Sequence, residues 1–198
     1  MQSKKTLFND PIYGFIPIDS ELILQLINHP FFQRLRRISQ MGLSNLVYPG
    51  AHHTRFEHAI GAMHVMRMAV NVLNQKGIEI SHEEIEAMKI AVLLHDIGHG
   101  PFSHASENIL IKGISHEVIS LKVIKKLNEE FDGKLDLAIK IFTNNYNRKF
   151  MYQLVSGQID VDRLDYLKRD SFYTGVTEGN INACLLYTSD AADDTPCV

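Results

Sequence analysis

Apolar residues recur every three or four positions along most of this sequence, the spacing of helices that bury one face. The longest such pattern begins near Thr54 and stops before Gly77, a residue type that often follows the last turn of a helix. A capping-box pattern at Ser81–Glu84 predicts a second long helix, which runs to about His95. The same reasoning predicts further helices over residues 21–28, 31–41, 115–130, 135–143, 150–155 and 160–170.

The N-terminal segment has a different pattern. Residues 7–18 contain two prolines, a glycine and alternating apolar positions, which predict a short strand or hairpin. A length of 198 residues suits one domain with a sizeable core. We therefore expect an all-α fold with a short N-terminal β-hairpin or extended segment.

The last stretch, residues 184–198, differs in composition from the rest. It holds both cysteines and three aspartates but no lysine or arginine, and these aspartates account for the net charge of −3. The stretch resembles translated adapter sequence, so we interpret residues 184–198 as a non-native tail and residues 1–183 as one domain that is incomplete at its C-terminus. An ordinary disordered tail is the alternative.

Composition narrows the function classes. Hydrophobic residues make up 45% of the chain and charged residues 22%, values that are ordinary for a soluble globular protein. Without an excess of positive charge, nucleic acid is not an expected partner. No apolar stretch is long enough to span a bilayer, and the first residues lack the apolar core of a signal peptide. We expect a cytoplasmic protein that does not bind a membrane.

The strongest chemical signal is the segment LLHDIGHGPFSH, residues 93–104. An apolar helix leads to His95 and Asp96, and a glycine-rich turn then carries His99 and His104. Adjacent residues on a helix point about 100° apart, yet both can reach one ion at the end of the helix. A buried helix with a hydrogen-bonded histidine is the alternative for any single histidine, but several titratable groups in one place favour a functional site.

Two other segments supply compatible groups. His58 follows Arg55 by one turn near the start of the long helix. The segment 156–170 places four aspartates on a helix, among them Asp162, and a solvated face with local ion pairs is the alternative there. Together, the three segments supply two imidazoles and two carboxylates that could bind one metal ion: His58, His95, Asp96 and Asp162.

This ligand set contains nitrogen and oxygen but no sulfur. It suits a six-coordinate divalent ion such as Mn²⁺, Fe²⁺, Co²⁺, Ni²⁺ or Mg²⁺, whereas Zn²⁺ is more usually tetrahedral. Such an ion neutralises phosphate charge and activates water, as the hydrolysis of a phosphate ester requires. The residues therefore indicate a metal-dependent phosphohydrolase.

Six blocks occur in an order that resembles a known family: LFNDPIYG, FFQRLRRISQMG, YPGAHHTRFEHAIG, LLHDIGHGPFSH, SHEVIS and IDVDRLDYLKRD. The His-Asp pair is typical of HD-domain phosphohydrolases. The ordered blocks, from Leu7 to Tyr173, resemble the SAMHD1-like deoxynucleoside triphosphate (dNTP) triphosphohydrolases. The resemblance implies an all-α HD domain that converts a dNTP and water to a deoxynucleoside and tripolyphosphate.

The resemblance also implies residue roles. The metal ligands would be the four residues named above. His104 would donate a proton to the leaving 5′-oxygen, while His99 and His116 would contact phosphate. The triphosphate would be held by Arg55 and Arg163, although the family usually has lysine at the second position. The sugar and base would lie near Gln40, Tyr166 and Asp170, with the Asp170 carboxylate accepting a hydrogen bond from the 3′-hydroxyl.

Cofactors and partners follow from the same resemblance. One divalent ion is expected, with a second Mg²⁺ able to accompany the triphosphate. Some relatives are activated by nucleotides at an oligomer interface, and Asn9, Gln33 and Arg36 resemble part of such an effector pocket. Ordinary polar surface residues are the alternative for these three. A homo-oligomer is expected for the complete protein.

Two other functions are compatible with these residues. One is a different HD phosphatase or phosphodiesterase that acts on nucleotides, which would release orthophosphate or a nucleoside monophosphate. The other is a non-catalytic regulator that binds nucleotide or nucleic acid. The complete ligand set argues against the regulator, because binding without turnover does not require four metal ligands.

Overall fold

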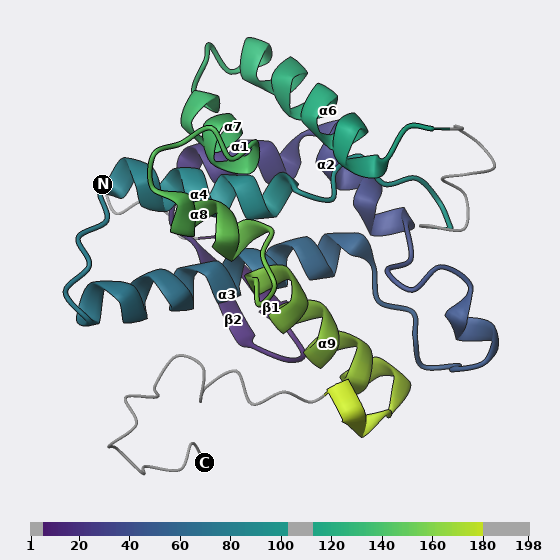
Figure 1. Cartoon of the computed structure of the whole chain (residues 1–198). Coiled ribbons are helices and arrows are strands. Elements are labelled where there is room, and N and C mark those ends of the chain that lie inside the picture. Colours follow the sequence, from purple (N-terminus) through teal and green to yellow (C-terminus); the bar gives the residue numbers. More distant parts are fainter. Residues whose placement is uncertain (1–5, 103–112, 180–198) are drawn as a thin grey trace.

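The computed structural model describes residues 6–102 and 113–179 (Figure 1). The chain begins with a hairpin in which β1 (Thr6–Asp10) pairs antiparallel with β2 (Gly14–Ile18). One carboxylate oxygen of Asp10 closes the turn by accepting hydrogen bonds from the backbone N–H groups of Ile12 and Tyr13 at 2.9 and 3.1 Å. The predicted N-terminal hairpin is confirmed.

The helices that follow the hairpin are short. Helix α1 (Glu21–Asn28) begins at Ser20, whose hydroxyl accepts from the N–H of Ile23. Helix α2 (Pro30–Gln33) continues into a 3₁₀ turn, η1 (Arg34–Arg37), and a second 3₁₀ turn, η2, spans Ser44–Leu46.

The predicted helix over residues 31–41 is wrong beyond Arg37. Ile38 is extended, with φ −116° and ψ 112°. Its carbonyl accepts from the N–H of Arg55 at 2.9 Å, and the N–H of Gln40 donates to the carbonyl of His53 at 3.0 Å. These bonds join segments distant in sequence, and they replace the intrahelical bonds that the local pattern predicts.

Two long helices form the centre of the fold. Helix α3 (Arg55–Gln75) and helix α4 (His82–Leu94) each begin with a capping box, formed by Thr54 with Glu57 and by Ser81 with Glu84. Helix α3 packs against α4 and, on another side, against α9 (Figure 1). Most of α3 is buried, because it has neighbours on several sides.

The remaining helices surround this centre. They are α6 (His116–Glu130), α7 (Asp136–Phe142), α8 (Lys149–Val155) and α9 (Val161–Thr174), and a 3₁₀ turn, η3, spans Thr177–Gly179. Helix α9 is longer than predicted and ends at Gly175, whose φ of +74° suits glycine. The structure confirms a mostly helical fold with a short hairpin. His104 and residues 184–198 lie outside the described residues. Within the described ranges, no helix combines the length and the apolar character that crossing a membrane requires.

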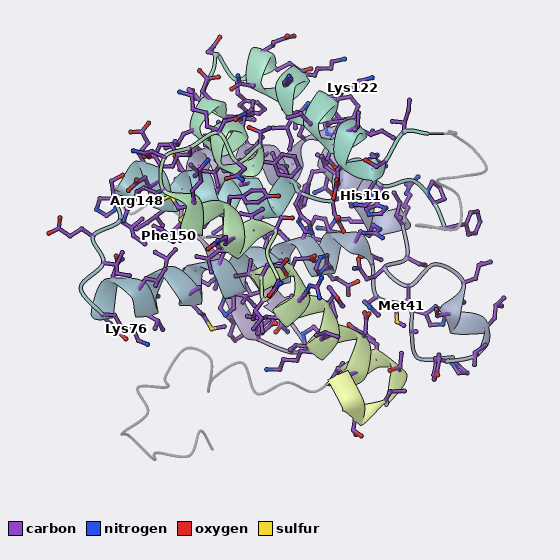
Figure 2. All side chains as sticks on the ribbon, in the orientation of Figure 1. Met41, Lys76, His116, Lys122, Arg148 and Phe150 are labelled. Atoms are coloured by element: carbon purple, nitrogen blue, oxygen red, sulfur yellow. The ribbon has the colours of Figure 1, made fainter. Side chains whose placement is uncertain are left out.

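Glu84 joins the start of α4 to the segment before α8. Its carboxylate accepts hydrogen bonds from Tyr146 Oη at 2.8 Å, from Arg148 Nη1 at 2.9 Å and from the N–H of Ser81 at 2.9 Å. Figure 2 shows Arg148 beside this region. Burial raises the pKa of Glu84, but these three hydrogen bonds outweigh burial and lower the pKa below its ordinary value.

We predict that Glu84→Gln lowers the free energy of unfolding at pH 7 by about 1 kcal/mol, the usual net contribution of a hydrogen bond. Because the folded-state pKa of Glu84 is lowered, its stabilisation is present above the unfolded pKa and is lost as pH falls through the folded pKa. Urea unfolding at pH 7 and pH 3 should therefore show a difference at pH 7 that shrinks at pH 3. The exposed neighbour Glu83→Gln is the control, and a pH-independent difference would contradict this prediction.

Candidate metal centre

Three helices bring histidines and carboxylates to one point. His58 lies in the first turns of α3, His95 and Asp96 directly follow α4, and Asp162 lies in the first turn of α9. Asp162 Oδ1 is 2.9 Å from His58 Nε2 and 3.3 Å from His95 Nε2. Asp96 Oδ1 is 3.5 Å from His95 Nε2, and Asp96 Oδ2 is 4.0 Å from His58 Nε2. The structure thus brings the four predicted ligands to one region. Ligand atoms of His58, His95 and Asp162 lie close enough together to hold one ion, whereas Asp96 groups with His99 and His116.

The other ring nitrogens of the two histidines have acceptors. His58 Nδ1 is 2.8 Å from Asp165 Oδ2, and His95 Nδ1 is 2.5 Å from the carbonyl oxygen of Val92. Both acceptors require a proton on Nδ1, so in each neutral ring the lone pair is on Nε2. Both Nε2 atoms are buried, and neither has a hydrogen-bond partner of suitable geometry among the described residues.

The carboxylates around His58 and His95 favour positive charge at the two imidazoles. Burial lowers the pKa of His58, but Asp162 and Asp165 outweigh burial and raise it to about 10. Burial likewise opposes the charged form of His95, whose pKa Asp96 and Asp162 raise to about 9. The pKa of Asp162 lies below its ordinary value, because the neighbouring imidazoles outweigh the effect of its burial. Orphaned imidazole nitrogens beside two carboxylates fit a divalent ion.

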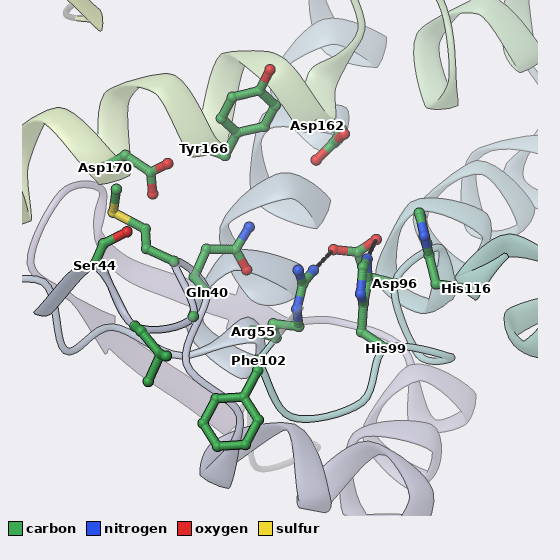
Figure 3. Close-up of a pocket in the computed structure, with 13 residues that line it drawn as sticks. Gln40, Ser44, Arg55, Asp96, His99, Phe102, His116, Asp162, Tyr166 and Asp170 are labelled. Atoms are coloured by element: carbon green, nitrogen blue, oxygen red, sulfur yellow. Dashed lines mark hydrogen bonds and ion pairs between the residues drawn. The ribbon is translucent and has the colours of Figure 1, made fainter. Parts of the chain in front are cut away.

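A second cluster adjoins the first. His99 Nε2 is 3.5 Å from Asp96 Oδ1, and the ring of His99 stacks on that of His116 with centroids 3.9 Å apart. Burial lowers the pKa of His99 to about 4 despite the nearby Asp96 carboxylate, so His99 is neutral at pH 7. Arg55 Nη1 forms an ion pair with Asp96 Oδ2 (Figure 3). Asp96 therefore belongs to the second cluster and also contacts both histidines of the first.

A cavity of about 600 Å³ opens over these clusters (Figure 3). Tyr166 and Asp170 extend toward it from α9, and Gln40 faces them from the segment after η1. The lining also includes the apolar side chains of Met41, Leu43 and Phe102. Most of the predicted site residues line this cavity: Gln40, Arg55, Asp96, His99, His116, Asp162, Tyr166 and Asp170.

Some predicted residues lie elsewhere. Arg163 is exposed and is not part of the cavity lining. Asn9 and Arg36 line a second cavity of about 300 Å³ beside the hairpin. Gln33 is not part of that lining; its Nε2 donates to the carbonyl of Ile27 at 2.7 Å, and its Oε1 accepts from Arg36 Nε at 2.9 Å.

Three residues at or next to the site were not among the predicted site residues. Asp165 and Arg169 are fully buried between α9 and α3, so the alternative of a solvated charged face is wrong for both. His53, which is 1% exposed, has Nε2 2.7 Å from Asp170 Oδ1. The spacing from Asp162 to Asp165 was the available signal, because residues three apart share a helix face.

Comparison with known proteins agrees with these observations. A family model for the HD domain matches residues 55–170. The chain is 36% identical over 190 residues to the uncharacterized protein YwfO of Bacillus subtilis, covering 91% of this chain and 43% of that protein. It is 33% identical over 211 residues to the deoxynucleoside triphosphate triphosphohydrolase SAMHD1 of Danio rerio, covering 86% of this chain and 34% of that protein.

A crystal structure of a phosphohydrolase from Bacteroides thetaiotaomicron superposes with a TM-score of 0.90 at 53% identity, covering 93% of this chain and 46% of that one. The chain therefore spans less than half the length of these three relatives. The family match extends from the first residue of α3 to Asp170 in α9 and so includes every element that supplies a candidate ligand. The chain belongs to the HD-domain family.

Proposed function

We propose that this chain is the catalytic HD domain of a metal-dependent phosphohydrolase that cleaves dNTPs to deoxynucleoside and tripolyphosphate. The observation that carries the proposal is the cluster of His58, His95 and Asp162, whose ligand atoms lie close enough together to hold one ion, with Asp96 in contact with both histidines. Asp96 and Asp162 line a cavity large enough for a nucleotide. The protein named SAMHD1 in Danio rerio, which is called a deoxynucleoside triphosphate triphosphohydrolase, supports the choice of substrate class.

The four ligands would hold the divalent ion, which supplies the Lewis acidity and the positive charge that phosphate-ester hydrolysis needs. The protein contributes a guanidinium at the same wall. Arg55 is 3% exposed and pairs with Asp96, so its position is fixed before a phosphate arrives. A fixed cation stabilises the charge of a phosphoryl group without the cost of ordering a flexible side chain.

His99 and His116 are proposed as phosphate contacts. The neutral ring of His99 is held between Asp96 and the stacked ring of His116, which fixes its orientation at the cavity wall. In the proposed reaction, the oxygen of a water molecule forms a bond to the α-phosphorus while the bond between that phosphorus and the 5′-oxygen breaks. The 5′-oxygen takes up a proton and leaves as the deoxynucleoside hydroxyl. His104, outside the described residues, is the proposed donor of that proton.

The far side of the cavity is proposed to hold the sugar and base. Tyr166 and Asp170 are one helical turn apart on α9, and both line the cavity. The carboxylate of Asp170 can accept a hydrogen bond from a sugar hydroxyl. Several further features stay predictions: a second Mg²⁺, Arg163 on the triphosphate, an activator at Asn9, Gln33 and Arg36, assembly into a homo-oligomer and a cytoplasmic location.

The test is product analysis. The 198-residue chain with Mn²⁺ is incubated with the four dNTPs, and the products are separated by chromatography. Deoxynucleoside and intact tripolyphosphate are expected. Orthophosphate or a nucleoside monophosphate would instead indicate another HD phosphohydrolase, and a chain that binds metal without turnover would contradict the proposal.

Asp96→Ala is predicted to abolish both metal binding and turnover. The substitution removes a ligand and the partner of Arg55, leaving a buried guanidinium next to two imidazoles. Bound metal per chain, measured by elemental analysis after gel filtration, should fall to background. Asp136→Ala, in the first turn of α7, is the control and should keep the metal. An Asp96 variant with one ion per chain and full activity would refute the assignment.

Asp170→Asn is predicted to raise KM about tenfold with a smaller change in kcat, since it weakens a charged hydrogen bond to a part of the substrate that does not react. Removing the 3′-hydroxyl of the substrate should raise KM in the same way. Steady-state kinetics with a dNTP and its 2′,3′-dideoxy analogue should therefore show discrimination by the unaltered chain and little by the variant. Equal discrimination by both would rule out this role for Asp170.

A further inference from the structure

A row of buried charges runs from His58 to the hairpin. His58 Nδ1 is 2.8 Å from Asp165 Oδ2, and Arg169 donates to both oxygens of Asp165, from Nε at 2.9 Å and from Nη2 at 3.0 Å. Arg169 Nη1 then donates to Asp10 Oδ2 at 2.8 Å. The side chains of His58, Asp165 and Arg169 are 0% exposed and that of Asp10 is 5% exposed.

The row fixes the carboxylate of Asp165 in one orientation. Because Arg169 binds both of its oxygens, the plane of the carboxylate cannot turn, and Oδ2 stays directed at His58. Asp10 is held in turn, since its other oxygen accepts from the N–H groups of Ile12 and Tyr13. Each charge has an opposite charge beside it, the condition under which buried ions are tolerated.

Helix α3 makes room for this row at Gly61, one turn after His58. A Cβ at Gly61 would overlap Asp165 Oδ1 and Arg169 Nη2. Glycine inside a helix is less favourable than alanine. The absence of a side chain at Gly61 thus leaves space for the Asp165–Arg169 pair. A contact between α3 and α9 with only a structural role could use apolar side chains instead.

We infer that Asp165, oriented by Arg169 and Asp10, is a positioning residue that holds the proton of His58 on Nδ1 and directs the Nε2 lone pair at the metal ion. Hydrogen bonds from carboxylates to ligating histidines fix the tautomer and the ring orientation, and they strengthen the ligand. The inference rests on the metal site of the proposed function, but its test does not require turnover.

The first test is metal affinity. Mn²⁺ binding by the 198-residue chain is measured by competition with a chromophoric chelator, for the unaltered chain and for Asp165→Asn. The variant keeps the size of the side chain but loses the charge that pairs with His58 and Arg169. Its Kd should rise about 10- to 100-fold. Glu84→Gln, which removes the charge of a buried carboxylate away from the site, should leave the Kd unchanged.

A second readout separates positioning from stability. With Co²⁺, the visible absorption spectrum reports the ligand geometry, which a purely structural role for Asp165 would not change. We expect the spectrum of Asp165→Asn to differ from that of the unaltered chain. An unchanged Kd and an unchanged Co²⁺ spectrum in this variant would overturn the inference, even if its melting temperature falls.

Two further variants keep the test independent of the folding of Asp165→Asn. Gly61→Ala changes no charged group but displaces the Asp165–Arg169 pair, so it should weaken Mn²⁺ binding in the same direction. Asp10→Asn leaves the contact between Asp165 and His58 in place and should weaken binding by a smaller factor. Unchanged Mn²⁺ affinity in both would overturn the inference. An unaltered chain that binds neither Mn²⁺ nor Co²⁺ would overturn the proposed function as well, whereas loss of turnover with intact metal binding would leave the inference standing.

Discussion

His58 lies between two carboxylates of α9, and this contact connects the candidate metal centre to the packing of the fold. Nε2 of His58 faces Asp162 at 2.9 Å and Nδ1 faces Asp165 at 2.8 Å. Both contacts require α9 to cross α3 near the first turns of each helix. The capping box at Thr54 and the cap at Asp160 fix where the two helices begin. The ligand geometry therefore depends on the start of each helix as well as on the packing between them.

Charge balance extends this constraint through the interior. On one side of the centre, Asp96 is shared between Arg55 and the histidines. On the other side, Arg169 lies between Asp165 and Asp10. Around the imidazoles, the carboxylates outnumber the guanidinium groups, so the surroundings carry net negative charge. A divalent cation at the Nε2 atoms would balance this charge.

The cavity next to the centre has a mixed lining. It includes the polar side chains of Arg55, His99 and His116 and the apolar side chains of Met41, Leu43 and Phe102. A ligand that combines a highly charged group with a flat, less polar group fits such a lining. A nucleoside triphosphate has these properties, which is why the proposal names a nucleotide rather than inorganic phosphate.

The sequence by itself determined the helices, the hairpin and the groups available for metal binding. Periodicity and capping patterns are local, so they located α3 and α4 closely, and the ordered blocks indicated His58, His95, Asp96 and Asp162. Only the tertiary structure decided which charged residues of α9 face inward: Asp165 and Arg169 are buried, while Arg163 is exposed. It also ended the helical segment after the 3₁₀ turn at Arg37, through hydrogen bonds to residues 53 and 55. These outcomes depend on partners far away in the chain, and the spacing of residues within one segment carries no information about such partners.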